Sequence, residues 1–254
     1  MDAPELEPAR HHQALKGLER VNRFSGTAAV LCHAIADSLS KSTMQAVDES
    51  SATSGSSASV AAKIVEPAAA RPTLRRPARI LDLACGGGDV TRAVYQYLTA
   101  RGIGAEVEGW DRSPTAIEYA RQRCANDHCI SFRQCDVSDL DGRAGDFDIV
   151  MCTLFLHHLD RDQARHLLGA MVRAARRMVL IDDLRRTWLG YRLAQLGCQL
   201  LTRSPIVHVD GPLSVRATFN EKEVEQLCIE SGIPQPRIRR HWPQRFLLRW
   251  DLGP

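Results

Sequence analysis

The chain has 254 residues, of which 44% are hydrophobic and 25% are charged, and its formal net charge is +3. This length and composition are typical of a globular protein with one sizeable core, and they exclude collagen-like and wholly disordered chains. So small a net charge does not indicate a dedicated nucleic-acid-binding protein, in which basic residues gather on one face. We interpret the arginine clusters that do occur as solvated faces and helix C-termini.

The cysteines and the start of the chain indicate a cytoplasmic protein. There are eight cysteines without a Cys-x-x-Cys motif, so we expect small buried thiols in a reducing compartment. The N-terminus begins with polar and acidic residues, which predicts no signal peptide. No apolar run reaches the roughly 18 residues that a membrane span needs. The histidines lack zinc-ligand spacing, and no metal site is predicted.

The first part of the chain divides into two segments. Apolar residues recur at helical spacing within residues 11–39, which predicts an N-terminal helical segment over residues 1–42. Residues 43–77 are rich in serine, alanine and proline, a composition typical of a low-complexity linker without fixed structure. Residues 78–254 are then expected to form one domain.

From residue 79 onward the pattern alternates between strands and helices. Strands are predicted over residues 79–83, 106–111, 130–135, 147–152, 178–182, 237–241 and 245–250. Helices are predicted over residues 90–101, 114–124, 161–174, 188–201 and 221–231. Ser113, Asp160 and Asn220 are the expected N-caps. The alternation predicts the α/β class, a doubly wound, mostly parallel, seven-stranded Rossmann-like sheet preceded by N-terminal helices, with its ligand at the carboxyl edge.

The most informative motif lies where the first of these strands ends. The strand runs into Asp82-Leu-Ala-Cys-Gly86-Gly87-Gly88 and then directly into a helix. Glycines let the backbone come close to a ligand, and the helix N-terminus offers free N–H groups with a partial positive charge. A dehydrogenase fingerprint beginning at Gly86 would need a further glycine at position 91, where Thr91 stands.

Three more strand ends carry polar groups. Asp111 closes the second strand, where a carboxylate can accept hydrogen bonds from two ribose hydroxyls. Asp136 follows the third strand and suits the exocyclic amine of an adenine. The fourth strand leads into a loop with His157 and His158. Because the carboxyl ends of parallel strands meet at one edge, these groups are expected to share a pocket.

Over residues 78–254 this ordered set resembles the class I S-adenosylmethionine-dependent methyltransferases. Within the small-molecule branch it resembles the enzymes of ubiquinone and menaquinone biosynthesis. The resemblance implies S-adenosyl-L-methionine as the cofactor, and it implies cofactor-binding residues at the four strand ends. These residues are Asp82, Ala84, Gly86 and Gly88 for the methionine end, Asp111 with Arg112 for the ribose, Asp136 and Val137 for the adenine, and Cys152 with its backbone beside the sulfonium. Many members have a glycine where this chain has Ala84.

The expected reaction is metal-independent O-methylation of a phenolic or quinol hydroxyl on a small apolar molecule. A positioned histidine can help to ionise such a hydroxyl, and His158, or alternatively His157, is the candidate. Either could instead cap a helix or pack against the sheet. Asp182 and Asp183 at the end of the fifth strand are further candidates, as is a His208–Asp210 pair in a stretch expected to be irregular.

Two motifs that are missing and one row of leucines bear on the identity of the methyl acceptor. The fourth strand lacks an Asn/Asp-Pro-Pro-Tyr run, which argues against adenine and glutamine-amide acceptors. It ends in Cys152-Thr153 rather than a carboxylate, which argues against a metal-dependent catechol enzyme. A stripe of leucines at 189, 193, 196 and 200 would pack against the sheet or, alternatively, cover an apolar acceptor and make peripheral contact with a membrane.

Two other functions stay open. An RNA-modifying methyltransferase would use the arginines between residues 237 and 249 with Trp242 and Trp250 as stacking platforms. Those residues also alternate as strands do, so no nucleic-acid partner is expected. A non-catalytic cofactor-binding partner is the third reading, and the intact Asp82, Asp111 and Asp136 argue against it.

Overall fold

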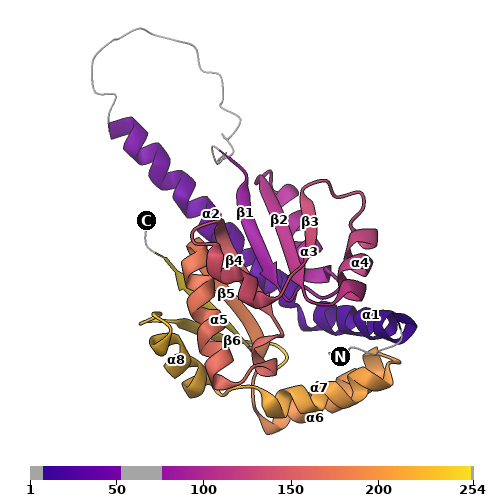
Figure 1. Cartoon of the computed structure of the whole chain (residues 1–254). Coiled ribbons are helices and arrows are strands. Elements are labelled where there is room, and N and C mark those ends of the chain that lie inside the picture. The colour runs from indigo at the N-terminus through magenta and orange to yellow at the C-terminus, as the bar shows by residue number, and fades with distance from the viewer. Residues whose placement is uncertain (1–7, 53–75, 253–254) are drawn as a thin grey trace, which may run out of the picture.

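A seven-stranded sheet forms the centre of the molecule (Figure 1). The computed structural model describes residues 8–52 and 76–252. The strand order is β3-β2-β1-β4-β5-β7-β6, and only β7 runs antiparallel to its neighbours, β5 and β6. The strands are β1 Ala78–Leu83, β2 Ala105–Asp111, β3 Ile130–Gln134, β4 Phe147–Thr153, β5 Ala175–Leu184, β6 Arg237–His241 and β7 Arg245–Asp251. The predicted mostly parallel α/β fold is confirmed.

Helices cover both faces of this sheet and extend beyond one end of it. They are α1 Pro8–Ser25, α2 Thr27–Ala52, α3 Asp89–Thr99, α4 Pro114–Arg123, α5 Arg161–Ala174, α6 Trp188–Leu201, α7 Pro205–Ala217 and α8 Glu221–Glu230, with the 3₁₀ helices η1 Val137–Gly142 and η2 Leu156–His158. The expected N-caps are confirmed, because Ser113, Asp160 and Asn220 each accept a backbone N–H of the following helix.

Alternation along the strands produces two separate cores. Successive residues of a strand face opposite sides of the sheet. Leu81 and Val150 pack on one face with α5 and α8, whereas Ile80 and Ile149 pack on the other face with α2 and α3. The sheet is therefore buried on both faces, as a parallel sheet requires.

The larger differences from the sequence-based predictions lie in α7, β5 and α2. The stretch expected to be irregular is helix α7, which begins at Pro205 and contains Pro212 within it. Strand β5 continues to Leu184, so Asp182 and Asp183 lie inside the strand and are fully buried. Helix α2 continues to Ala52, inside the segment predicted as a linker over residues 43–77. The rest of that prediction falls on residues 53–75, outside the described residues.

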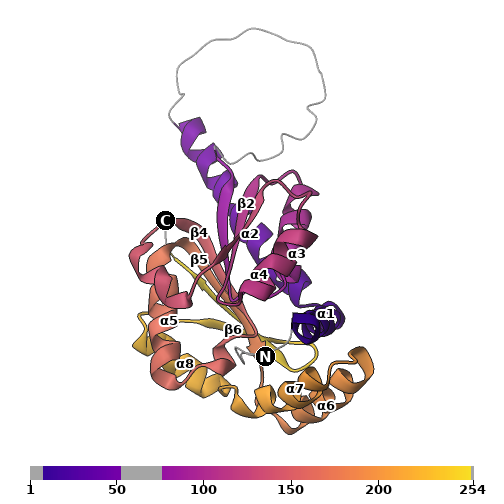
Figure 2. The ribbon, with the colours of Figure 1, turned by 45° about the vertical axis from the view of Figure 1, so that its right-hand side comes forward.

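The leucine stripe of α6 does not pack against the sheet. Helix α6 packs on α7 and α1 instead, and Leu189, Leu196 and Leu200 are exposed. Figures 1 and 2 show α1, α6 and α7 together at the end of the molecule where the parallel strands finish. In the described part of the chain no helix has both the length and the apolar character needed to span a bilayer.

Candidate functional site

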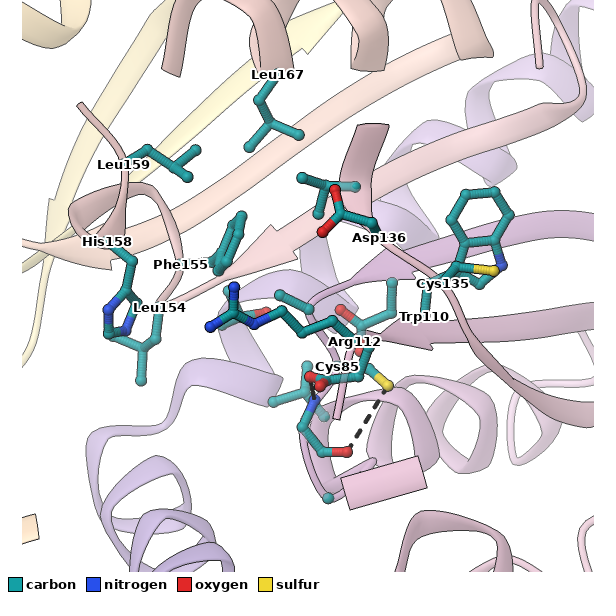
Figure 3. Close-up of a pocket in the computed structure, with 18 of the residues that line it drawn as sticks. Cys85, Trp110, Arg112, Cys135, Asp136, Leu154, Phe155, His158, Leu159 and Leu167 are labelled. Carbon is teal, nitrogen blue, oxygen red and sulfur yellow. Dashed lines mark hydrogen bonds between the residues drawn. The ribbon is translucent and has the colours of Figure 1, made fainter. Parts of the chain in front are cut away.

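A cavity of about 580 Å³ lies at the carboxyl ends of β1 to β4 (Figure 3). Helix α1 forms one wall of it through Leu15, Leu18 and Asn22. Figure 3 shows Phe155, His158 and Leu159 on one side of the cavity and Asp136 with Trp110 on the other, with the Arg112 side chain extending between them. The carboxyl ends of the parallel strands thus meet at one pocket, as expected for this topology.

Most residues predicted to hold the cofactor line this cavity. They are Asp82, Ala84, Gly86, Asp111, Arg112, Asp136 and Val137. Two predicted residues do not line it. Gly88 stands at the N-cap of α3 with its Cα facing the Phe132 ring, 2.7 Å from where a Cβ would lie. Cys152 is fully buried within β4, and the next residue, Thr153, lines the cavity in its place.

The turn after β1 has a left-handed backbone at alternate positions. The φ angles are +53° at Ala84, +53° at Gly86 and +72° at Gly88. Glycine adopts this region freely, whereas a residue with a Cβ pays about 1–2 kcal/mol there. Ala84 therefore stands in a strained position that explains why a glycine suits it. The turn brings the backbone of Gly86 and Gly87 to the cavity surface.

Asp111 is held by the backbone on both of its oxygens. The Gly86 N–H donates to Oδ2 at 2.9 Å, and the Ser113 N–H donates to Oδ1 at 2.8 Å. These bonds fix the plane of the carboxylate, whose two oxygens can each accept more than one hydrogen bond. The arrangement suits a vicinal diol, whose two hydroxyls can donate one to each oxygen.

Asp82 has one satisfied oxygen and one unsatisfied oxygen. Oδ2 accepts a hydrogen bond from Thr91 Oγ1 at 2.6 Å. Oδ1 is buried without a hydrogen-bond partner among the described residues, and the residue lines the cavity. Burial raises the pKa of Asp82 from 3.8 to about 7, against the opposing effect of the Thr91 bond. Such an orphaned carboxylate oxygen fits a cationic donor such as the ammonium group of S-adenosylmethionine.

Asp136 lies at the start of η1 and is held in its charged form. Its Oδ1 accepts hydrogen bonds from the Ser138 N–H at 3.0 Å and the Ser138 hydroxyl at 2.8 Å. The bond from the Ser138 backbone, followed by the bond from its side chain, lowers the pKa of Asp136. A charged acceptor therefore stands next to the apolar side chain of Val137, a combination that suits an adenine ring with its exocyclic amine.

Helix α1 is tied to this wall through the half-buried carboxylate of Asp89. Asn22 Nδ2 donates to Asp89 Oδ2 at 3.1 Å, and Asn22 Oδ1 accepts from Arg245 Nη2 at 3.3 Å. Burial raises the pKa of Asp89, and the Asn22 bond opposes that effect. The charges of Asp89 and Asp111 add to the effect of burial in raising the pKa of Asp82, so the site favours a cationic ligand.

The two candidate histidines have different surroundings. His158 lines the cavity. His157 is buried, and its Nδ1 lies 2.7 Å from Asp183 Oδ1, while its backbone N–H donates to Asp183 Oδ2 at 3.2 Å. Burial alone would raise the pKa of Asp183, but His157 and the backbone N–H groups bring it below its usual value. The two imidazole rings lie 4.2 Å apart between centroids. The His157 ring, which Asp183 holds, therefore packs against the His158 ring.

The remaining predicted candidates do not reach the cavity. Asp182 binds Arg245 and His241 inside the sheet. His208 Nε2 lies 2.8 Å from the Thr202 carbonyl oxygen, within the turn between α6 and α7. Neither residue lines the cavity, because β5 continues past Asp182 and the stretch expected to be irregular is helix α7.

Several lining residues were not found from the sequence. Asp162, Gln163 and His166 come from the first turns of α5, and Leu15, Leu18 and Asn22 come from α1. The apolar spacing of α1 predicted a helix but carried no information about which surface that helix covers. Among the described residues, no group of three or more histidine, cysteine or acidic residues could hold a metal ion.

The match to known proteins covers the strand ends just described. Residues 80–177 match the family model described as a methyltransferase domain. That range runs from β1 into β5 and contains the end of every strand that lines the cavity. Residues 80–177 therefore form a methyltransferase domain.

Curated relatives of this methyltransferase domain match over part of their length. The ubiquinone biosynthesis O-methyltransferase of Mesorhizobium japonicum is 32% identical over 140 residues, covering 54% of this chain and 53% of that protein. The enzyme of the same name from Methylococcus capsulatus is 30% identical over 129 residues, covering 49% of this chain and 51% of that protein. The chain thus spans about half the length of these relatives.

Solved structures share the fold. A SAM-dependent methyltransferase from Aquifex aeolicus has a TM-score of 0.51 at 14% identity, covering 71% of this chain and 85% of that one. The CMeT domain of the citrinin polyketide synthase has a TM-score of 0.54 at 16% identity, covering 69% of this chain and 46% of that one.

Proposed function

We propose that this chain transfers a methyl group from S-adenosylmethionine to a hydroxyl of a small apolar acceptor, a phenol or a quinol, without a metal ion. The observation that carries the proposal is the cavity itself. It brings together the strand-end carboxylates Asp82, Asp111 and Asp136, each with a hydrogen-bonding geometry that suits one part of the cofactor.

The chain's own residues would hold the cofactor at three places. Asp82 binds the ammonium of the methionine end through its unpaired oxygen, next to the turn at Gly86. Asp111, with Arg112 beside it, binds the ribose hydroxyls. Asp136 and Val137 bind the adenine. The bound cofactor supplies an activated methyl group on a sulfonium.

The other side of the cavity suits an apolar acceptor. Phe155, Leu159 and Leu167 line it, and α1 adds Leu15 and Leu18 to the cavity wall. Burying apolar groups here excludes water and aligns the acceptor, and such positioning is worth about 7–11 kcal/mol of the barrier. An apolar acceptor with one reactive hydroxyl is therefore the class that this wall accommodates.

His158 would take the acceptor proton. A phenol has a pKa of about 10, so its ionisation at neutral pH benefits from a nearby base. His158 stands at the cavity with the buried His157 ring packed against it, and Asp183 fixes that ring. The relatives from Mesorhizobium japonicum and Methylococcus capsulatus are O-methyltransferases by name, which supports a hydroxyl as the acceptor group.

The arginines of the C-terminal strands β6 and β7 support an RNA substrate less well than the cavity supports a small-molecule acceptor. Arg240 binds Glu221, Arg245 binds Asp182, and Arg249 binds Asp251. These guanidinium groups already have carboxylate partners, so phosphates would have to displace them. We therefore favour the small-molecule acceptor.

Methyl transfer into an extract of the source cells tests the proposal. The protein is incubated with radiolabelled S-adenosylmethionine and the extract, and label is partitioned between organic, RNA and protein fractions, with Asp111→Ala protein as the control. We expect label in the organic fraction. Label in RNA or protein would contradict the acceptor class. Intact cofactor binding by calorimetry without any label would favour a non-catalytic binding protein.

A further inference from the structure

The α6–α7 hairpin carries a concentration of exposed apolar side chains. We call this set the apolar hairpin face. It consists of Trp188, Leu189, Leu196 and Leu200 on α6 with Val209 and Leu213 on α7, and their exposed fractions are 77%, 47%, 54%, 82%, 60% and 52%. Single exposed apolar residues are ordinary, but a gathered set marks an interaction site.

This exposure does not result from loose packing of the hairpin. The opposite faces of the two helices are buried, with Gly190 and Cys198 on α6 and Val207 and Val215 on α7. At Gly211 the helices come so close that an added Cβ would lie 2.4 Å from Cys198 Sγ. The hairpin is therefore firmly packed by one face and presents the apolar hairpin face outward.

The charges around this face are positive. Helix α6 contains no acidic residue and α7 contains only Asp210. Arg192 lies within α6 and Arg203 in the turn after it, and within residues 8–52 and 76–252 neither has a carboxylate partner. By contrast, Arg185 and Arg186 just before α6 are held by Glu221 and Glu223. The face thus combines apolar side chains with cations that are open to an anionic ligand.

We propose that the apolar hairpin face docks on an anionic lipid bilayer. Leucine and tryptophan side chains would enter the interfacial and acyl region, as in helices that lie in the membrane plane. Arg192 and Arg203 have stems long enough to lie along apolar surface while the guanidinium reaches the lipid phosphates. Tryptophan at 188 suits the headgroup level, where indole rings gather.

The position of the hairpin connects this surface to the cavity. Helices α6 and α7 both pack against α1, whose Leu15, Leu18 and Asn22 wall the cavity, and α7 also packs against η2, which carries His158. Figure 2 shows α6 and α7 next to α1 at the same end of the molecule. This inference rests on the proposed function, because docking here would let an apolar acceptor pass from the bilayer to the cavity.

A second copy of the chain is a less suitable occupant. In a two-fold dimer the same surface patch meets itself, so the arginines of one apolar hairpin face would approach those of the other. Arg192, Arg203 and Arg216 outnumber the one acidic residue of the hairpin, and this repulsion would oppose association. An anionic surface has the complementary charge.

Vesicle flotation of the full chain tests the proposal. We expect the protein to float with vesicles of phosphatidylcholine and phosphatidylglycerol and not with phosphatidylcholine alone. Leu196→Ser with Leu200→Ser should weaken binding by about tenfold for each leucine, and Arg192→Glu with Arg203→Glu by about fivefold for each arginine. Ile229→Ser, at a 50% exposed position on α8, is the matched control and should leave binding unchanged.

The outcomes separate this inference from the proposed function. Lack of binding to anionic vesicles, or equal binding by the leucine variants, would overturn the docking surface. Sedimentation that reveals a dimer dissociated by Leu200→Ser would assign the face to a second copy and also overturn it. Calorimetry with S-adenosylmethionine, which we expect to give the same affinity for all these variants, reports separately on the cofactor site.

Discussion

The two halves of the cavity are built in different ways. On the cofactor side, carboxylates are held by backbone groups close to them: Asp136 by Ser138, and Asp111 by Ser113 and by Gly86 of the adjacent strand end. On the proposed acceptor side, side chains come from η2 and α5, and the wall is completed by α1, which lies far earlier in the chain. The proposed cofactor half is therefore specified by short motifs at neighbouring strand ends, whereas the rest of the cavity depends on how a remote helix packs.

Replacing His158 should have the largest effect on catalysis, a loss of turnover without a loss of cofactor binding. His158→Ala should lower kcat by about 10²–10⁴ if this residue takes the acceptor proton, while the affinity for S-adenosylmethionine stays unchanged. Steady-state kinetics and calorimetry measure the two effects. His166→Ala is the matched control, because His166 also lines the cavity but lies 2.8 Å from the Asp141 carboxylate. Equal losses in both variants would contradict a special role for His158.

Replacing Asp111 should have the opposite effect, because it weakens cofactor binding rather than the removal of the acceptor proton. Asp111→Ala should weaken cofactor binding by about 10²–10⁴-fold, since it removes two hydrogen bonds to a charged group, each worth about 1.5–3 kcal/mol. Asp111→Asn keeps one accepting oxygen, so its affinity for the cofactor should lie between those of the parent protein and Asp111→Ala. Calorimetry with S-adenosylhomocysteine reads the effect without any acceptor. Unchanged affinity in Asp111→Ala would show that the ribose lies elsewhere.

Asp82 should make cofactor affinity depend on pH. Its pKa in the folded protein is raised to about 7, so below pH 7 the carboxyl must lose a proton before it can pair with an ammonium. Affinity should fall by about tenfold for each pH unit below 7 and level off above it. In Asp82→Asn this dependence should disappear and the affinity should be low throughout. A pH profile of the dissociation constant measures both.

The raised pKa of Asp82 also affects the stability of the protein. Here the protonated carboxyl is the favourable form, whereas cofactor binding needs the charged one. The folded pKa lies above the value of 3.8, so the folded protein holds this proton more tightly than the unfolded chain does. That contribution to stability is complete below about pH 3.8 and is lost as pH rises to about 7. Asp82→Asn should therefore be more stable than the parent above pH 7, by an amount on the order of a few kcal/mol. Urea unfolding at pH 5 and pH 8 checks the difference.

The sequence predicted the cofactor half better than the acceptor half for a physical reason. Strand ends, glycine turns and N-caps such as Ser113 are local patterns, and parallel topology brings them together. The contact between His157 and Asp183 joins η2 to the interior of β5, and no local pattern reports such a pairing. Helix α7 was missed because Gly211-Pro212 normally interrupts helices. Here Gly211 allows close packing on Cys198, and Pro212 is buried within the helix.

The smallest expected effect concerns the turn after β1. Ala84 lines the cavity with a φ of +53°, where a Cβ costs about 1–2 kcal/mol. Ala84→Gly removes that strain but increases the freedom of the unfolded chain by about 0.5–1 kcal/mol. The net gain in unfolding free energy should be at most about 1.5 kcal/mol, measured by urea titration. Ala100→Gly, at a right-handed helix C-cap, is the control and should lose stability. A loss at Ala84 as well would mean that its methyl group makes contacts worth more than the strain, and the turn would then be fixed by packing rather than by the backbone alone.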